Sequence, residues 1–136
     1  MPLTLTITEE ILPKGSEKRA IAELTSAMLK WHGLSDNEVM TPNITATIHV
    51  LPIGSTFSGG DEFKGAWVEW KVPSFAFSSE DIQKGYFEEA TNIIYRLSGD
   101  KQPKDNIYIN VVHTVDGAWN FDGRAMTNEE IMATIS

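Results

Sequence analysis

The sequence predicts an α+β fold in which a β-α-β unit occurs twice, giving a four-stranded mixed sheet with two helices on one face. Four segments alternate polar and apolar residues, as half-buried strands do. Two segments between them carry apolar residues every three or four positions, as amphipathic helices do. Equivalent positions in the two halves, Ser16 with Ser79 and Ile44 with Ile107, are separated by the same 63 residues. The pattern therefore indicates a duplication of structure.

The first half of the chain is expected to be strand, helix, strand. Residues 2–8 alternate, and after the break at residues 13–15 Ser16 is expected to cap a helix that ends at Gly33. The apolar stripe of this helix is Ala20, Ile21, Leu24, Ala27, Met28 and Trp31. Alternation resumes over residues 43–51. A helical crossover between the two strands implies that they run parallel.

The second half repeats this order. Residues 66–73 alternate, and Ser78 and Ser79 lead into a helix that ends at Gly99. The apolar stripe of this helix is Ile82, Tyr86, Ala90, Ile93, Ile94 and Leu97. A fourth strand is expected over residues 107–113. Both helices then cover one face of the sheet.

Two further segments complete the expected single domain of residues 1–136. The Gly- and Ser-rich stretch from Gly54 to Gly65 is expected to be a loop or hairpin between the halves. Residues 117–123 are expected to be turns carrying two exposed aromatic residues, Trp119 and Phe121. Thr127 and Glu130 have capping-box spacing and predict a short last helix.

The sheet face without helices is the first indication of self-association. It is expected to carry threonines together with Trp67, Tyr108 and Val112. This mixture is too apolar for an ordinary solvent face and too polar for a monomer core. We therefore expect the bare face to pack against other copies of the chain.

Composition excludes several classes of function. The 136 residues include no cysteine, which excludes disulfide scaffolds, thiolate metal sites and cysteine nucleophiles. A formal net charge of −8 makes nucleic acid and anionic membranes poor partners. The chain has no apolar run of about 20 residues and does not begin like a signal peptide. We expect a cytoplasmic protein.

The histidines do not predict a metal site. His32, His49 and His113 stand singly, with no carboxylate at metal-ligand spacing, so each is expected to be structural. His32 falls at a helix C-terminus, where a positive charge is favourable. Lys71 is the one cation within its strand, and it is expected either to bind an anion or to pair with Glu69 on the same face.

Pro2 is the strongest candidate for chemistry. If Met1 is removed, the Pro2 nitrogen becomes a secondary amine, and the small side chain of Pro2 favours that removal. An exposed α-amine has a pKa of about 7.7–8.0. An apolar pocket lowers that pKa, so the amine could serve as a general base near neutrality.

Taken together, the residues resemble the tautomerase superfamily, which includes 4-oxalocrotonate tautomerase, malonate semialdehyde decarboxylase, the chloroacrylic acid dehalogenases and macrophage migration inhibitory factor. The resemblance covers nearly the whole chain and rests on the order of its motifs within the doubled β-α-β plan. These motifs are Met1-Pro2, His49-Val50-Leu51-Pro52, Gly59-Gly60, Ile107-Tyr108-Ile109-Asn110 and Trp119-Asn120-Phe121.

The resemblance implies a cofactor-independent enzyme that forms a homotrimer, with the bare sheet face lining the trimer core. It implies that Pro2 is the catalytic amine in a pocket shared between neighbouring subunits. Tyr108 and Asn110 match the tyrosine and asparagine that the family uses to orient the substrate from an adjacent chain. The segment Trp119-Asn120-Phe121 resembles the tryptophan-containing loop of bacterial decarboxylase-like members, and Trp119 is accordingly expected to contact the substrate.

The sequence departs from the family where a substrate carboxylate is bound. Members that act on carboxylates usually carry one or two arginines at the end of the third strand, and this chain has Lys71 there. Arg124 is the other cation expected to reach the pocket. The resemblance favours keto-enol proton transfer on a small 2-keto acid or enol. The alternatives are a decarboxylase or hydratase of the same superfamily and a catalytically silent trimeric binding protein.

Overall fold

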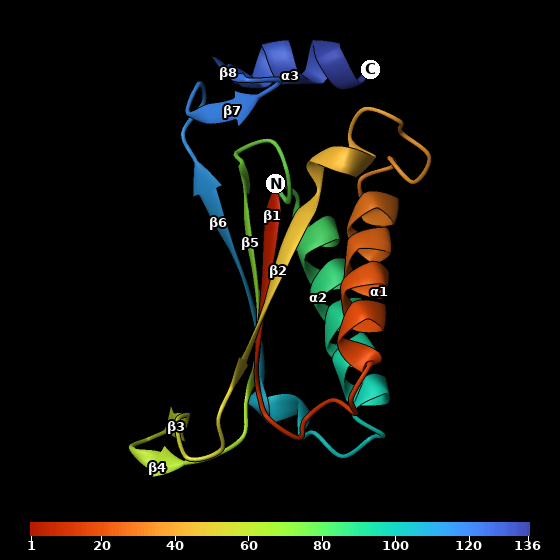
Figure 1. Ribbon diagram of the computed structural model, residues 1–136. Helices are drawn as coiled ribbons and strands as arrows, with labels where there is room; N and C mark the ends of the chain where they lie inside the picture. The colour runs from red at the N-terminus through yellow and green to blue at the C-terminus, as the bar shows by residue number, and fades with distance from the viewer.

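The computed structural model describes residues 1–136 and contains the two β-α-β units in one sheet (Figure 1). The strands of the sheet are β1 (Pro2–Thr8), β2 (Thr45–Leu51), β5 (Ala66–Pro73) and β6 (Ile107–Thr114). Their order is β2-β1-β5-β6. β2 runs parallel to β1 and β6 runs parallel to β5, while the central pair β1 and β5 is antiparallel. The predicted four-stranded mixed sheet is confirmed.

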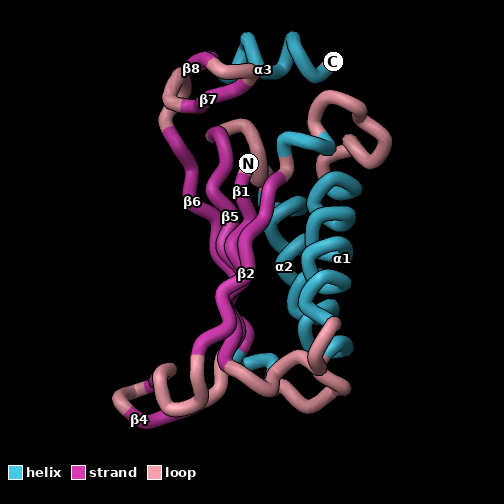
Figure 2. The backbone as a smooth tube through the Cα atoms, in the orientation of Figure 1, coloured by secondary structure: helices cyan, strands magenta, loops and turns pink.

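Two long helices, α1 (Ser16–Trp31) and α2 (Glu80–Leu97), cover one face of this sheet (Figure 2). Every second residue of β1 and β5 points toward them and is buried, so the alternation in the sequence marks the core. Trp70 and Tyr86 are the largest fully buried side chains. The Trp70 indole N–H donates to the Tyr86 hydroxyl at 2.9 Å, and that hydroxyl donates to the Leu24 carbonyl at 3.0 Å. One hydrogen-bonded chain therefore joins the sheet to both helices.

The two helices begin differently. Ser79 caps α2 as predicted, because its hydroxyl accepts the Ile82 N–H at 3.2 Å. The prediction that Ser16 caps α1 is wrong, since Gly15 holds the cap position and Ser16 is already helical. Gly15 has φ 93°, a left-handed conformation that residues with a Cβ rarely adopt, and its N–H donates to the Glu17 carboxylate at 3.0 Å.

Short elements extend one end of the sheet. The predicted hairpin between the halves is formed by β3 (Phe57–Ser58) and β4 (Asp61–Glu62). Its turn is Gly59-Gly60, both residues with positive φ, as a tight hairpin requires. Two short 3₁₀ turns, at Thr41–Asn43 and Lys104–Asn106, precede β2 and β6.

The C-terminal segment forms a cap at the other end of the sheet (Figure 1). It consists of β7 (Trp119–Phe121), β8 (Arg124–Met126) and α3 (Asn128–Ile135). The short last helix is confirmed, with Thr127 accepting the Glu130 N–H at 3.2 Å. None of the helices combines the length and apolar character needed to cross a membrane.

The expectation that residues 117–123 are turns with two exposed aromatic residues is wrong. Trp119 is partly buried, and Phe121 is only 3% exposed. The register pairs Trp119 with Met126, so the hairpin places Trp119, Phe121 and Met126 on one face. Phe121, Met126 and the α3 residue Ile131 all belong to the buried core.

Candidate active site

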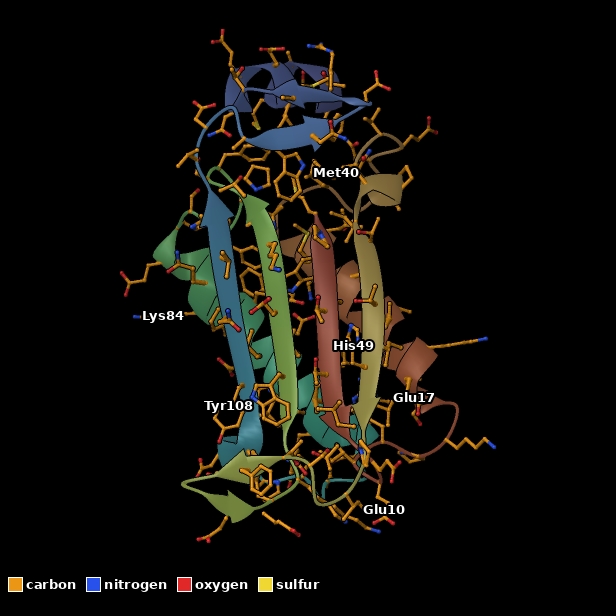
Figure 3. All side chains as sticks on the ribbon, turned by 60° about the vertical axis from the view of Figure 1, so that its left-hand side comes forward. Glu10, Glu17, Met40, His49, Lys84 and Tyr108 are labelled. Atoms are coloured by element: carbon orange, nitrogen blue, oxygen red, sulfur yellow. The ribbon has the colours of Figure 1, made fainter.

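The sheet face opposite the helices is uncovered, as predicted (Figure 3). Tyr108 is 40% exposed and Val112 is 43% exposed on it. The strand register arranges the side chains of this face in three rows. The rows, from the N-terminal end of β1, are Thr45, Pro2, Lys71 and Val112, then Thr47, Thr4, Glu69 and Asn110, then His49, Thr6, Trp67 and Tyr108.

Pro2 begins β1 at the end of the sheet where the C-terminal cap lies. It pairs with Thr45 on β2, and it stands one step beyond the pair Leu3–Trp70, which places it opposite Lys71 on β5. The structure thus brings together the two residues that the sequence singled out for base chemistry and for anion binding.

The chain terminus beside Pro2 lies in a desolvated environment. Met1 is 6% exposed, and its amine donates to the Asn43 carbonyl at 2.6 Å. Burial lowers the pKa of this amine from 8.0 to about 6, because the surroundings solvate an ammonium poorly. While Met1 is attached, the Pro2 nitrogen is a tertiary amide without basicity.

Lys71 lies near Glu69, one of its two expected partners, and its binding of an anion stays a prediction. Its ammonium lies 3.9 Å from a Glu69 oxygen, which is an ion-pair distance but too long for a hydrogen bond. The side chain is 58% exposed. The other Glu69 oxygen accepts the Asn110 amide at 3.3 Å. The contact with Glu69 is therefore weak enough for an anionic ligand to compete for Lys71.

Tyr108 lies far from Pro2 in the same chain. It is four residues along β6 from Val112, the partner of Lys71, and at about 3.3 Å per residue this is about 13 Å. Its ring stacks on Trp67 with centroids 6.0 Å apart and an interplanar angle of 19°. Asn110 is one row, or about 7 Å, from the row of Pro2. A single chain thus does not bring Tyr108 to the Pro2 nitrogen.

Trp119 and Arg124 lie in the C-terminal cap. The Arg124 guanidinium pairs with the Glu130 carboxylate at 2.9 Å, and this hydrogen bond holds the pKa of Glu130 below its usual range. Arg124 remains 62% exposed. Figure 1 shows the cap above the same end of the sheet as the chain N-terminus. Arg124 therefore lies in the cap at the end of the sheet where β1 begins, although it already has Glu130 as a carboxylate partner.

His32 directly follows α1, at a helix C-terminus where a positive charge is favourable, but its ring is half-buried. Burial lowers its pKa, which outweighs the attraction of the helix C-terminus. Its Nε2 accepts the Phe77 N–H at 2.9 Å, a partner 45 residues away for which the local sequence holds no signal. His49 is exposed on the outer face, and His113 contacts the Ala76 carbonyl at 2.7 Å.

A cavity of about 920 Å³ lies elsewhere, between α1 and α2. It is lined by Lys30, Trp31 and Glu89 among other residues, and it does not include Pro2 or Lys71. Lys30 and Trp31 both donate to Glu89, at 2.6 and 3.1 Å. These three side chains therefore satisfy one another, and the cavity lies apart from the N-terminal end of β1.

Comparison with known proteins places the fold. No family model matches the chain, and no curated protein matches it. A member of the cis-3-chloroacrylic acid dehalogenase family matches with a TM-score of 0.77 and 13% identity, over 100% of this chain and 93% of that one. A macrophage migration inhibitory factor-like protein from Entamoeba histolytica matches with a TM-score of 0.70 and 16% identity, over 92% of this chain and 97% of that one.

A third match is a fused 4-OT in a symmetric trimer, with a TM-score of 0.74 and 8% identity, over 95% of this chain and 97% of that one. All three belong to the tautomerase superfamily that the sequence resembles. The chain has the tautomerase fold. The structural similarity establishes the fold. Sequence identities this low do not establish the reaction.

Proposed function

We propose that the protein, once Met1 has been removed, is a cofactor-independent tautomerase that moves a proton between carbon and oxygen of a small 2-keto acid or enol. The observation that supports this most directly is the position of Pro2 at the start of β1, opposite Lys71. Burial lowers the pKa of the neighbouring Met1 amine, and we expect the surroundings of Pro2 to lower the pKa of its amine in the same direction. A neutral amine at physiological pH is the state that a general base requires.

In the proposed reaction, the Pro2 nitrogen takes a proton from the carbon next to the carbonyl, and the electron pair of that C–H bond forms the enolate. The ammonium of Pro2 then delivers the proton to the enolate oxygen, so that no proton is gained or lost. Ketonisation of an enol follows the same steps in reverse, with Pro2 taking the proton from the oxygen and delivering it to the carbon. The positive charge of Lys71 or Arg124 holds the substrate carboxylate. Tyr108 and Asn110 donate hydrogen bonds to the developing enolate oxygen.

This assignment requires more than one chain. Because Tyr108 lies about 13 Å along the sheet from the row of Pro2, it can serve only the Pro2 of a neighbouring subunit. A homotrimer built on the uncovered sheet face meets this requirement, and one structural neighbour, a fused 4-OT, is a symmetric trimer. Sedimentation should give a mass near three times 15.1 kDa. A stable monomer at micromolar concentration would exclude the shared site.

The principal test compares processed wild-type protein with the Pro2→Ala variant. Mass spectrometry should show a chain lacking Met1, and this chain should ketonise phenylenolpyruvate. Pro2→Ala should lose about 10²–10⁴-fold in kcat, the usual contribution of a general base. Thr4→Ala, a change on the same face of β1, is the matched control and should keep activity. Equal activity in Pro2→Ala would exclude the proline mechanism.

The pH dependence tests the protonation state of the amine. Activity should rise with pH as Pro2 loses its proton, with a midpoint below the roughly 7.7–8.0 of an exposed α-amine. A decarboxylase or hydratase that uses the protonated amine would instead lose activity as pH rises. 2-Oxo-3-pentynoate, which inactivates one structural neighbour, should modify Pro2 selectively in the active protein.

The anion site is tested by two alanine variants. Lys71→Ala should raise KM for a carboxylate substrate more than it lowers kcat, because Lys71 contributes ground-state binding. If Lys71→Ala is unchanged and Arg124→Ala raises KM, the role belongs to Arg124.

The second candidate function is a catalytically silent trimeric binding protein. It is favoured by one observation, that both candidate cations lie beside carboxylates, Lys71 near Glu69 and Arg124 near Glu130. Removal of Met1 without any turnover of phenylenolpyruvate would favour this candidate. Retention of Met1 in native material, again without activity, would favour it equally.

A further inference from the structure

The loop between β5 and α2 is held by side chains from three separate elements. The Phe77 N–H donates to His32 Nε2 at 2.9 Å, and Gln83 on α2 donates to the Phe77 carbonyl at 2.8 Å. His113 on β6 contacts the Ala76 carbonyl at 2.7 Å. Phe77 has φ 53°, an uncommon conformation for a residue with a side chain, so these contacts hold the loop in a shape that it would not keep by itself.

This loop adjoins the candidate active site. It starts directly after β5, whose outer face presents Lys71 opposite Pro2. Asn128 of the C-terminal cap donates to Ser74 of the loop at 2.8 Å. The loop therefore links the end of β5 to the cap, the two parts that hold the candidate carboxylate-binding cations.

The contacts of His32 determine its protonation state. Its Nδ1 lies 2.8 Å from the Met28 carbonyl, which can only accept, so Nδ1 carries the hydrogen. Its Nε2 faces the Phe77 N–H, which can only donate, so Nε2 carries none. The ring is thus neutral in the folded state. A second proton, on Nε2, would place one N–H donor against another and break the hydrogen bond from the Phe77 N–H.

His113 makes a contact that does not require an unprotonated nitrogen. Its Nε2 faces the Ala76 carbonyl and therefore donates, and a doubly protonated ring can make the same bond. The two histidines hold the same loop, but only the contact of His32 requires an unprotonated nitrogen. His113 is consequently a matched internal control.

The protonation of His32 depends on the burial of its ring and on its contacts with the Met28 carbonyl and the Phe77 N–H. No carboxylate lies within 4.0 Å of it, the ion-pair distance. On α1, Lys30 is paired with Glu89 of α2. The Tyr86 hydroxyl of α2 is bonded to Leu24, and the remaining ring against His32 is that of Phe77, at 4.7 Å.

We propose that His32 is a positioning residue for the Pro2 end of the sheet, which as the neutral Nδ1–H tautomer holds Phe77 and the loop after β5, and which releases them when it is protonated. Burial of the ring lowers the pKa of His32, so the release is expected at a lower pH than the protonation of an exposed histidine. The part of this inference that concerns catalysis rests on the proposed function. The part that concerns the loop does not.

The loop is tested by NMR on the wild-type chain and on His32→Gln. Glutamine can accept from Phe77 and donate to Met28 but does not titrate. The wild-type ring nitrogens should show the Nδ1–H tautomer at pH 7.5. Between pH 7.5 and pH 5, hydrogen-exchange protection of the Phe77 amide should fall at least about tenfold in wild type and less than about twofold in His32→Gln. His113→Gln should behave like wild type.

Two results would overturn the loop inference. One is an Nε2–H tautomer of His32 in the wild-type chain, a measurement that does not depend on any variant. The other is an equal pH response of the Phe77 amide in wild type and in His32→Gln.

Kinetics test the positioning role separately. KM for a 2-keto acid should rise with falling pH at least about threefold more in wild type than in His32→Gln, while the pH profile of kcat, which follows Pro2, stays the same in both. Equal KM profiles would refute positioning even if the loop responds as expected. If neither protein has any activity, the proposed function fails, and the NMR result still decides the behaviour of the loop.

Discussion

The buried hydroxyl of Tyr86 provides a sharp test of how the sheet is joined to the helices. Tyr86→Phe removes one oxygen atom and leaves the ring in place. That oxygen accepts the Trp70 indole N–H at 2.9 Å and donates to the Leu24 carbonyl at 3.0 Å. Both Trp70 and Tyr86 are 0% exposed, so water cannot replace the lost oxygen. Burial raises the pKa of Tyr86, which therefore stays protonated and able to donate.

The expected cost follows from which groups are left without partners. The Leu24 carbonyl lies within α1 and keeps its helical hydrogen bond, so losing the tyrosine donor costs about 1 kcal/mol. The Trp70 N–H becomes a buried donor without an acceptor, which costs about 1–3 kcal/mol. The total is about 2–4 kcal/mol of unfolding free energy. For a chain of this length, that lowers Tm by roughly 6–15 °C.

Chemical denaturation at fixed protein concentration measures this effect, with the concentration held constant because association would shift the transition. Tyr95→Phe is the matched control, since Tyr95 lies on the same helix and is only partly buried. It should change stability by less than about 0.5 kcal/mol. If Tyr86→Phe is no more destabilising than Tyr95→Phe, the hydrogen-bonded chain contributes nothing and the reasoning is refuted.

Three further substitutions test separate parts of the fold and assembly. Gly85→Ala should lower the unfolding free energy by about 1–3 kcal/mol in a urea titration, because the new Cβ would lie 2.2 Å from the Trp31 ring. This clash outweighs the better helix propensity of alanine. A gain in stability would show that the Trp31 ring moves freely. Phe121→Ala should cost about 3–5 kcal/mol, since the side chain is 3% exposed; a calorimetric Tm equal to that of wild type would contradict the packing of the cap. Val112→Asp should dissociate the proposed trimer in sedimentation, whereas an unchanged mass would place the interface elsewhere.

The parts of the fold that the sequence predicted are those specified by neighbours along the chain. Alternation in residues 2–8 and 66–73 identified strands and their buried faces, because side-chain direction in a strand depends only on position. The capping hydroxyls of Ser79 and Thr127 bond to amides three residues away, and both were predicted. The resemblance of the motifs also identified the fold that the structural comparison found.

Apart from the cap assigned to Ser16, what the sequence missed depended on residues distant in the chain. The sequence related His32 only to the end of its own helix, but its partner Phe77 comes from the loop after β5. Phe121 was expected to be exposed because its segment is rich in turn residues, and it is buried because the hairpin packs with α3. Local propensity cannot report burial that another element creates.

The same distinction between local sequence and tertiary structure applies to the candidate site. The sequence by itself singled out Pro2 as a candidate, because a proline at position 2 becomes a secondary amine when Met1 is removed, and it singled out Lys71 as the cation within its strand. Only the tertiary structure decided that Pro2 and Lys71 face each other across β1 and β5, and that Tyr108 lies about 13 Å away along the sheet. Strand order and register arise from packing over the whole chain, so the distances between functional groups are tertiary properties that no local pattern encodes.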